Sequence, residues 1–173
     1  MAQSESMTVR SMREGERDAV RDVTLAAYEE YAGLLPEPLW AVYRRNLLAT
    51  LDGGSPAERI VAEREGAVVG SVLLFPAAAN AYASAAPGGA YPEVRLLAVL
   101  PSERGRGIGG ALMDECVRRA RRAGAVALGL HTMDVMRAAM RMYERMGFVH
   151  VPDLDFTPAQ GILVRGYRLD LRN

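Results

Sequence analysis

The residues best suited to bind a ligand lie in the loop Arg104-Gly105-Arg106-Gly107-Ile108-Gly109-Gly110, called the glycine loop below. The apolar run Glu93–Val99 before it predicts a strand, and Ile108–Ala123 after it predicts a helix. Free backbone N–H groups at a helix start, together with glycines that let a ligand approach the backbone, form an anion site. The sequence therefore predicts a ligand that carries phosphate.

More than one phosphate ligand fits such a loop. Gly105, Gly107 and Gly110 satisfy the G-x-G-x-x-G pattern of dinucleotide-binding folds. That pattern normally follows its strand at once and belongs to two strand-helix-strand halves, whereas Leu100–Arg104 intervenes here and one such unit is present. A dinucleotide-binding fold also needs an acidic residue that binds the ribose. Asp134 could be that residue, but it falls after the apparent end of the predicted strand Ala125–Thr132. A Walker P-loop is excluded because the chain has no lysine.

A second pattern, Arg/Gln-x-x-Gly-x-Gly/Ala, is met by Arg104, Gly107 and Gly109. Further along, Tyr143–Phe148 reads Tyr-Glu-Arg-Met-Gly-Phe. The order along the chain is strand, glycine loop, helix, strand, helix and Tyr-Glu-Arg-Met-Gly-Phe. Together these features resemble the GNAT superfamily of acetyl-CoA-dependent N-acetyltransferases. The resemblance covers about a third of the chain, from Glu93 to Phe148.

The resemblance implies that acetyl-CoA is the co-substrate, without a metal. The backbone of the motif strand would pair with the pantetheine arm, and the amides of the glycine loop would bind the pyrophosphate with support from its arginines. The expected cofactor-binding residues are Leu97, Ala98, Val99, Arg104, Gly105, Arg106, Gly107, Ile108, Gly109 and Gly110. Met136 stands where the family usually has an asparagine that contacts the pantetheine.

The resemblance also implies two catalytic residues. Tyr143 would protonate the departing CoA thiolate, and the backbone amide of Val99 would stabilise the oxyanion. Glu93 would take the proton of the amine, directly or through water. Strand alternation places Glu93 on one face with Arg95, so a structural ion pair is the alternative role; His131 and Glu63 are further candidates for the base.

The acceptor is expected to be a primary amine of a small molecule or a peptide. The resemblance implies that the acceptor pocket draws on the first helical segments and on the loop 76–91, which contain aromatic rings and carboxylates, and both of these attract cations. The candidates are Tyr28, Glu29, Glu30, Tyr31, Trp40, Tyr82 and Tyr91. Two other functions stay open at this point: a non-catalytic acyl-CoA-binding sensor, and a nucleotide-dependent oxidoreductase.

The elements that must position these residues follow from hydrophobic periodicity and from glycine and proline punctuation. The predicted helices are Ala19–Tyr31, Pro38–Leu51, Ile108–Ala123 and Val135–Met146. The predicted strands are Met7–Met12, Arg59–Arg64, Ala67–Phe75, Glu93–Val99, Ala125–Thr132, Phe148–Val151 and Ile162–Leu171. The predicted fold class is α/β. The resemblance implies a central mixed, mostly antiparallel sheet with splayed central strands, together with about four helices.

Length and composition fit one domain, 1–173, with residues 1–6 as a flexible tail. The 21 basic and 21 acidic residues cancel, which argues against nucleic acid or a membrane surface as a partner. The single cysteine excludes an internal disulfide. The sequence shows no signal peptide or long apolar run, so a cytoplasmic location is expected. A homodimer is left open.

Overall fold

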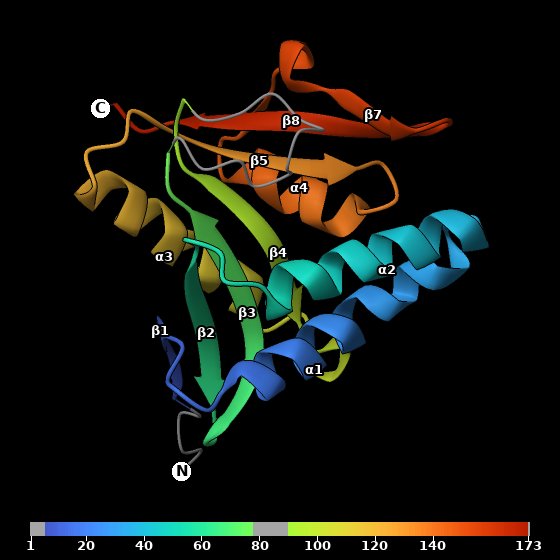
Figure 1. The fold of residues 1–173 in the computed structure, drawn as a ribbon. Helices are drawn as coiled ribbons and strands as arrows, with labels where there is room; N and C mark the ends of the chain where they lie inside the picture. The colour runs from blue at the N-terminus through green and yellow to red at the C-terminus, as the bar shows by residue number, and fades with distance from the viewer. Residues whose placement is uncertain (1–5, 78–89, 173) are drawn as a thin grey trace. The chain divides into compact units, whose positions relative to one another are not determined.

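The computed structural model describes residues 6–77 and 90–172, and Figure 1 shows the order of the elements. The helices are α1 (Arg17–Tyr28), α2 (Glu37–Asp52), α3 (Ile108–Arg122) and α4 (Arg137–Arg145), with short 3-10 turns η1 (Glu29–Gly33), η2 (Pro101–Glu103) and η3 (Pro152–Leu154). The strands are β1 (Met7–Ser11), β2 (Glu58–Arg64), β3 (Ala67–Phe75), β4 (Glu93–Val99), β5 (Ala127–Met133), β6 (Val149–His150), β7 (Phe156–Ala159) and β8 (Ile162–Asp170).

The strands are hydrogen-bonded in the order β1-β2-β3-β4-β5-β8-β6, and β7 pairs with β8. The pairs β1/β2, β5/β8, β6/β8 and β7/β8 are antiparallel, whereas β4 and β5 are parallel. The pairing of β4 with β5 joins Glu93 to Gly129 and Val94 to Leu130. The predicted mixed, mostly antiparallel sheet is therefore confirmed, while the splaying of its central strands stays a prediction.

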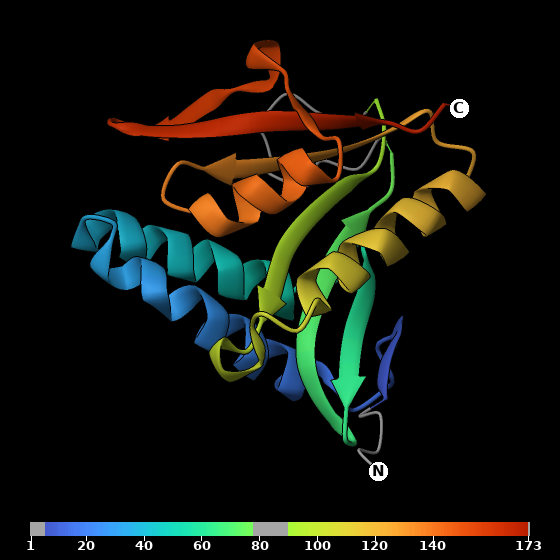
Figure 2. The same ribbon diagram turned by 180° about the vertical axis from the view of Figure 1, so that it is seen from behind.

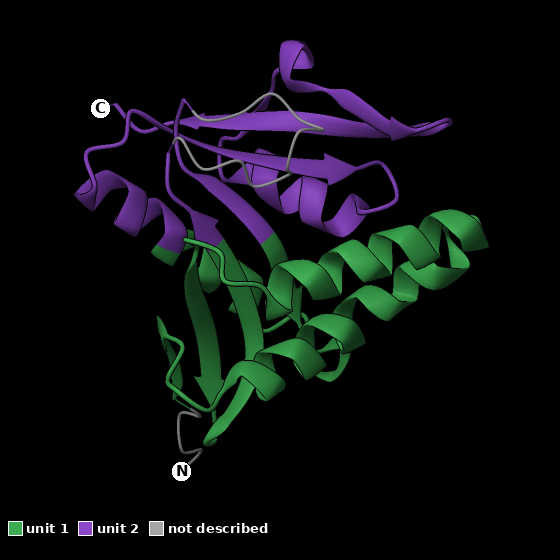
Figure 3. Cartoon of the chain, viewed as in Figure 1, with its two compact units in different colours: residues 1–73, 96–115 green, residues 74–95, 116–173 purple. Residues whose placement is uncertain are grey.

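The chain divides into two compact units, coloured separately in Figure 3. The first contains residues 1–73 and 96–115, and the second contains residues 74–95 and 116–173. In the first unit, α1 and α2 lie side by side as a helical hairpin, and β1, β2 and β3 are neighbours (Figures 1 and 2). In the second unit, β8 pairs with β5 along its length, from Ala127 with Asp170 to Met133 with Val164. The single predicted domain stays a prediction.

Apolar side chains at helical spacing explain the buried face of α1, where Val20, Val23 and Ala27 are each at most 4% exposed. The helix ends at Tyr28, earlier than predicted, because the chain tightens into η1. Two glycines with left-handed backbone, Gly124 (φ +75°) and Gly147 (φ +95°), follow the last turns of α3 and α4. The other predicted boundaries agree with the structure to within a few residues, as expected for frayed ends.

One strand, β7, is not among the predicted strands, which pass from Phe148–Val151 directly to Ile162–Leu171. Proline removes a backbone donor and is tolerated where the pairing is irregular. The ladder of β7 with β8 does shift between Phe156 and Ala159. Gly161, with φ +82°, makes the tight turn that brings β8 back along β7. The predicted loop 76–91 and tail 1–6 lie largely outside the described residues.

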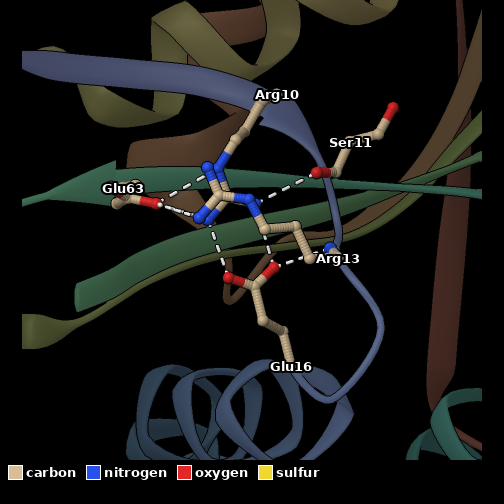
Figure 4. Close-up of polar contacts among 5 residues, drawn as sticks. All are labelled: Arg10, Ser11, Arg13, Glu16 and Glu63. Carbon is tan, nitrogen blue, oxygen red and sulfur yellow. Dashed lines mark hydrogen bonds and ion pairs between the residues drawn. The ribbon is translucent and has the colours of Figure 1, made fainter. Parts of the chain in front are cut away.

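A cluster of charged side chains, called the Arg10 cluster, joins β1, β2 and the start of α1 (Figure 4). The Arg10 guanidinium donates to both carboxylate oxygens of Glu16, at 2.9 and 2.7 Å, and also to Glu63. The backbone N–H of Arg13 donates to Glu16 at 2.7 Å. Hydrogen bonds from Arg10 and then from Arg13 lower the pKa of Glu16 from 4.5 to about 2. The ionised Glu16 therefore ties the first helix to the sheet.

No helix in the described ranges combines the length and the apolar character that crossing a membrane requires.

Candidate functional site

The glycine loop leads from η2 into α3 and has the backbone that the sequence predicts for an anion site. Gly105 and Gly107 have φ of +77° and +78°, a region that residues with a Cβ rarely adopt. An added Cβ would meet nothing within 4 Å at either position, so glycine is needed there for conformation and not for space. The carbonyl of Gly107 accepts the first bond of α3, from Ala111 at 3.0 Å.

The amides of Ile108, Gly109 and Gly110 therefore form the first turn of α3, where a helix offers donors without intrahelical acceptors. A phosphate group can accept such bonds, and the positive end of the helix dipole favours its charge. The start of α3 packs closely on β3, where a Cβ added to Gly70 would lie 3.0 Å from Ile108 and 3.1 Å from the Ala98 carbonyl. Glycine at position 70 thus lets β4 and the start of α3 approach β3.

The arginines of the glycine loop have protein partners. Arg104 donates to the Glu30 carboxylate at 2.6 Å and to the Ala27 carbonyl at 3.1 Å, so it ties the loop to the end of α1 and to η1. Arg106 lies 3.5 Å from the Glu103 carboxylate. The predicted support of a pyrophosphate by these two cations therefore competes with carboxylates that the chain itself supplies.

Within the motif strand β4, Leu96 has φ +55°, a backbone region that residues other than glycine rarely adopt. Along β4, Ala98 is buried, whereas Leu97 and Val99 are half-buried. The Glu93 side chain is buried, at 8% exposure, and its carboxylate meets His131 of β5. The ion pair of Glu93 with Arg95 stays a prediction.

Glu93 meets His131 on β5, and the structure brings together two residues that the sequence offered as separate candidates. The Glu93 Oε2 lies 3.3 Å from His131 Nδ1, and the Leu154 carbonyl lies 2.9 Å from His131 Nε2. The His131 side chain is fully buried, and its ring packs edge-on against Phe156 at 5.3 Å between centroids. Leu154 and Phe156 belong to the η3–β7 segment that sequence reasoning treated as a loop, so no periodic signal revealed this arrangement.

The third base candidate, Glu63, lies in the Arg10 cluster (Figure 4). Its carboxylate accepts hydrogen bonds from Arg10 and lies 3.5 Å from the Arg13 guanidinium. Glu63 therefore serves the connection between β1 and β2.

Tyr143 lies on the buried side of α4 at 7% exposure. Its ring packs edge-on against Phe148 at 5.9 Å, and its carbonyl accepts from the Phe148 amide at 3.0 Å. The second sequence motif is thus one structural feature, a helix end closed by Gly147 and capped by an aromatic contact. Met136, at the start of α4, is buried, and its sulfur accepts a hydrogen bond from Thr132 at 3.6 Å. The Met136 sulfur thus has a hydrogen-bond partner within the protein.

Four aromatic residues of α1, η1 and α2 form a continuous row, called the aromatic stack below, with one edge-on and two stacked contacts. Tyr28 contacts Tyr31 at 5.6 Å and Tyr43 at 6.1 Å, and Tyr43 contacts Trp40 at 6.1 Å between ring centroids. Burial raises the pKa of Tyr31 to about 12, and the Glu30 charge adds to the rise. The sequence named Tyr28, Tyr31 and Trp40 for the acceptor but missed Tyr43. Tyr82 lies outside the described residues, and Tyr91 stands beside Glu93 in the second unit.

No group of three or more His, Cys, Asp and Glu residues within 6–77 and 90–172 is arranged to hold a metal ion.

Comparison with known proteins gives a family match. The model of the acetyltransferase (GNAT) family matches residues 18–148, which include the glycine loop and Tyr143. The mycothiol acetyltransferase of Propionibacterium freudenreichii subsp. shermanii is 36% identical over 69 residues. That segment is 39% of this chain and spans 22% of the length of that enzyme.

Solved structures share the fold. A GNAT-family acetyltransferase from Staphylococcus aureus Mu50 has a TM-score of 0.73 at 15% identity and covers 96% of this chain and 100% of its own. A GNAT-family acetyltransferase from Brucella melitensis in complex with acetyl-CoA has a TM-score of 0.60 at 23% identity, with 98% and 90% covered. The ribosomal-protein-S18-alanine N-acetyltransferase from Escherichia coli has a TM-score of 0.66 at 15% identity, with 97% and 96% covered.

Proposed function

The chain belongs to the acetyltransferase (GNAT) family, and from that premise we propose that it transfers the acetyl group of acetyl-CoA to a primary amine of a small molecule or a peptide. The observation that carries the proposal is the match over residues 18–148, which spans both sequence motifs. The similar protein from Brucella melitensis was solved with acetyl-CoA bound, which supports the same donor here. We propose the cytoplasm as the compartment of the reaction.

The glycine loop is proposed to bind the pyrophosphate of CoA. Its two left-handed glycines, Gly105 and Gly107, and the free amides of the first turn of α3 suit an anion that approaches the backbone. Leu97, Ala98 and Val99 are proposed to pair with the pantetheine arm. Arg104 and Arg106 are proposed to contribute charge, reduced by their carboxylate partners Glu30 and Glu103.

The proposed reaction is a direct attack within a ternary complex. The neutral amine attacks the thioester carbonyl, so an N–C bond forms and the C–S bond breaks. Glu93 takes the proton that the amine loses, and Tyr143 gives a proton to the departing thiolate. The Val99 amide is proposed to stabilise the oxyanion that develops between these steps.

The residues of the chain indicate the identity of the acceptor amine less directly than that of the acetyl donor. The related proteins named above include a mycothiol acetyltransferase and a ribosomal-protein-S18-alanine N-acetyltransferase, so the family and its fold accommodate acceptors of very different size. The aromatic stack of Tyr28, Tyr31, Tyr43 and Trp40 offers ring faces that suit a cationic or amphipathic amine. We propose that this stack contributes to acceptor selection.

The test is a thiol-release assay with acetyl-CoA across a panel of polyamines, amino acids, amine-bearing antibiotics and peptides. We expect turnover with at least one class, and in Tyr143→Phe a fall in kcat of about 100-fold with little change in acetyl-CoA affinity. Tyr167→Phe is the matched control, because it also removes a buried tyrosine hydroxyl of the second unit. Calorimetric titration accompanies the assay: tight acetyl-CoA binding without turnover would support a sensor, and NAD binding without acetyl-CoA binding would support an oxidoreductase.

A further inference from the structure

His131 faces an acceptor at each ring nitrogen. Its Nε2 lies 2.9 Å from the Leu154 carbonyl, and its Nδ1 lies 3.3 Å from the Glu93 carboxylate. A carbonyl oxygen can only accept a hydrogen bond, so Nε2 carries a proton. With Nε2 committed and Nδ1 turned to Glu93, no ring nitrogen is left to take a proton from a substrate. His131 is therefore not the base itself.

The second ring nitrogen of His131, Nδ1, determines how His131 and Glu93 interact. Without a further proton, the lone pair of Nδ1 faces the Glu93 carboxylate, and both atoms are acceptors. One added proton between Nδ1 and Oε2 turns this repulsion into a charge-assisted hydrogen bond. Both side chains are more than nine-tenths buried, at 0% and 8% exposure, so water screens the contact little. The Glu93–His131 pair is thus built to accept one proton as a unit.

The backbone around the pair holds the imidazole in this orientation. A Cβ added to Gly166 on β8 would lie 2.3 Å from the Leu154 Cβ, so glycine lets η3 lie directly on β8. The Gly166 carbonyl also accepts from the Val151 amide at 2.8 Å. The Leu154 carbonyl and the Phe156 ring then fix His131 from two sides. The close approach at Gly166 explains why the η3–β7 segment has a fixed position.

Tyr91 is an ionisable neighbour of Glu93 in the second unit. Tyr91 precedes β4 and lies beside Glu93, and Arg168 of β8 stands 5.6 Å over the Tyr91 ring. Burial and then the Glu93 charge raise the pKa of Tyr91, which keeps its phenol neutral.

We propose that His131 is a positioning residue that acts through Glu93, so that the pair and not the carboxylate alone takes the proton of the attacking amine. The inference rests on the proposed function. The amine N–H bond breaks, the proton goes to Glu93 Oε2, and the new O–H donates a hydrogen bond to the lone pair of His131 Nδ1, which stabilises the protonated pair. The proton passes to water after the acetylated product leaves, which restores the carboxylate and the neutral imidazole.

The kinetic test is His131→Asn, which keeps an amide donor toward Glu93 but removes the imidazole ring. We expect kcat/KM for the amine to fall about 10- to 100-fold with KM for acetyl-CoA unchanged, and the acidic limb of its pH profile to move to lower pH. The double variant with Glu93→Gln should be no slower than Glu93→Gln alone, because the two residues act as one unit. His150→Asn, which changes the other histidine, should keep the wild-type pH profile.

Nitrogen NMR of the histidine rings tests the pair independently of turnover and of variants at position 131. The chain has only two histidines, so His150→Asn assigns both signals. We expect the His131 Nε2 signal to be that of a nitrogen that carries a proton, and the Nδ1 signal to change in Glu93→Gln. An Nδ1 signal that is indifferent to Glu93→Gln, or an unshifted pH profile with additive losses, would overturn the inference. A wild type without turnover for any amine would instead overturn the proposed function.

Discussion

Arg104, the first residue of the glycine loop, donates a 2.6 Å hydrogen bond to the carboxylate of Glu30. The contact links the loop to η1, and both side chains are about two-fifths exposed. A cation that we propose to meet a phosphate is thus shared with a carboxylate of the same chain. The pairing sets the shape of the loop and at the same time lowers the charge available to a ligand.

Glu30→Gln separates these two effects, because glutamine keeps an acceptor for Arg104 but removes the negative charge. We expect acetyl-CoA to bind about 2- to 5-fold more tightly, with the gain lost at high salt. Isothermal titration at two ionic strengths measures it. Glu29→Gln makes the same change in net charge at the neighbouring position and should alter affinity less. Weaker binding in Glu30→Gln would show that the carboxylate contributes to the site by ordering the loop.

Gly107→Ala places a Cβ on a backbone with φ +78° at the start of α3. We expect the free energy of unfolding to fall by about 1 kcal/mol and acetyl-CoA affinity to fall at least 10-fold, because relief of the strain moves the first-turn amides. Gly15→Ala is the matched control: it has φ +88°, and an added Cβ there also meets nothing within 4 Å. It should show the same loss of stability with unchanged affinity, and equal affinity losses in both variants would contradict a role of the loop in binding.

Glu16 makes stability depend on pH through the Arg10 cluster. Its pKa is lowered in the folded protein to about 2 from 4.5, so its contribution is present above pH 4.5 and is lost as pH falls toward 2. We expect Glu16→Gln to lower the free energy of unfolding by about 1 to 2 kcal/mol at neutral pH, and the difference from wild type to vanish near pH 2. Urea unfolding across this range measures it. Glu14→Gln, in the same turn but exposed, should follow the wild-type curve; a pH-independent difference in Glu16→Gln would refute the linkage.

Gly166→Ala tests the contact that fixes the η3–β7 segment. The added Cβ would lie 2.3 Å from the Leu154 Cβ and 3.2 Å from its carbonyl carbon and oxygen, so backbone must move. We expect a loss of about 3 kcal/mol in stability and a change in the His131 Nε2 signal, because the Leu154 carbonyl shifts. Gly110→Ala, where an added Cβ meets nothing within 4 Å, controls for the general effect of the substitution on unfolding. An unchanged His131 signal in a folded Gly166→Ala protein would show that the segment does not hold the ring.

Local signals in the sequence were sufficient for most elements and for the glycine loop. The run Glu93–Val99 and the glycines that follow it predict a strand, an irregular turn and a helix start, because hydrophobic periodicity and the left-handed preference of glycine act over a few residues. The structure has these elements where expected, with φ of +77° and +78° at Gly105 and Gly107. The match to the acetyltransferase (GNAT) family confirms what the spacing of the loop and Tyr143–Phe148 indicated.

Only the tertiary structure decided which of these residues are partners. The sequence places Glu93 with Arg95 and leaves His131 as a separate candidate, because alternation says nothing about contacts between strands. Parallel pairing of β4 with β5 and the close approach of Leu154 to Gly166 bring Glu93 to His131. Likewise, the Glu30 partner of Arg104 lies far away in the sequence. Periodicity and turn chemistry are local properties, whereas a buried hydrogen-bonded pair depends on segments that meet only after folding.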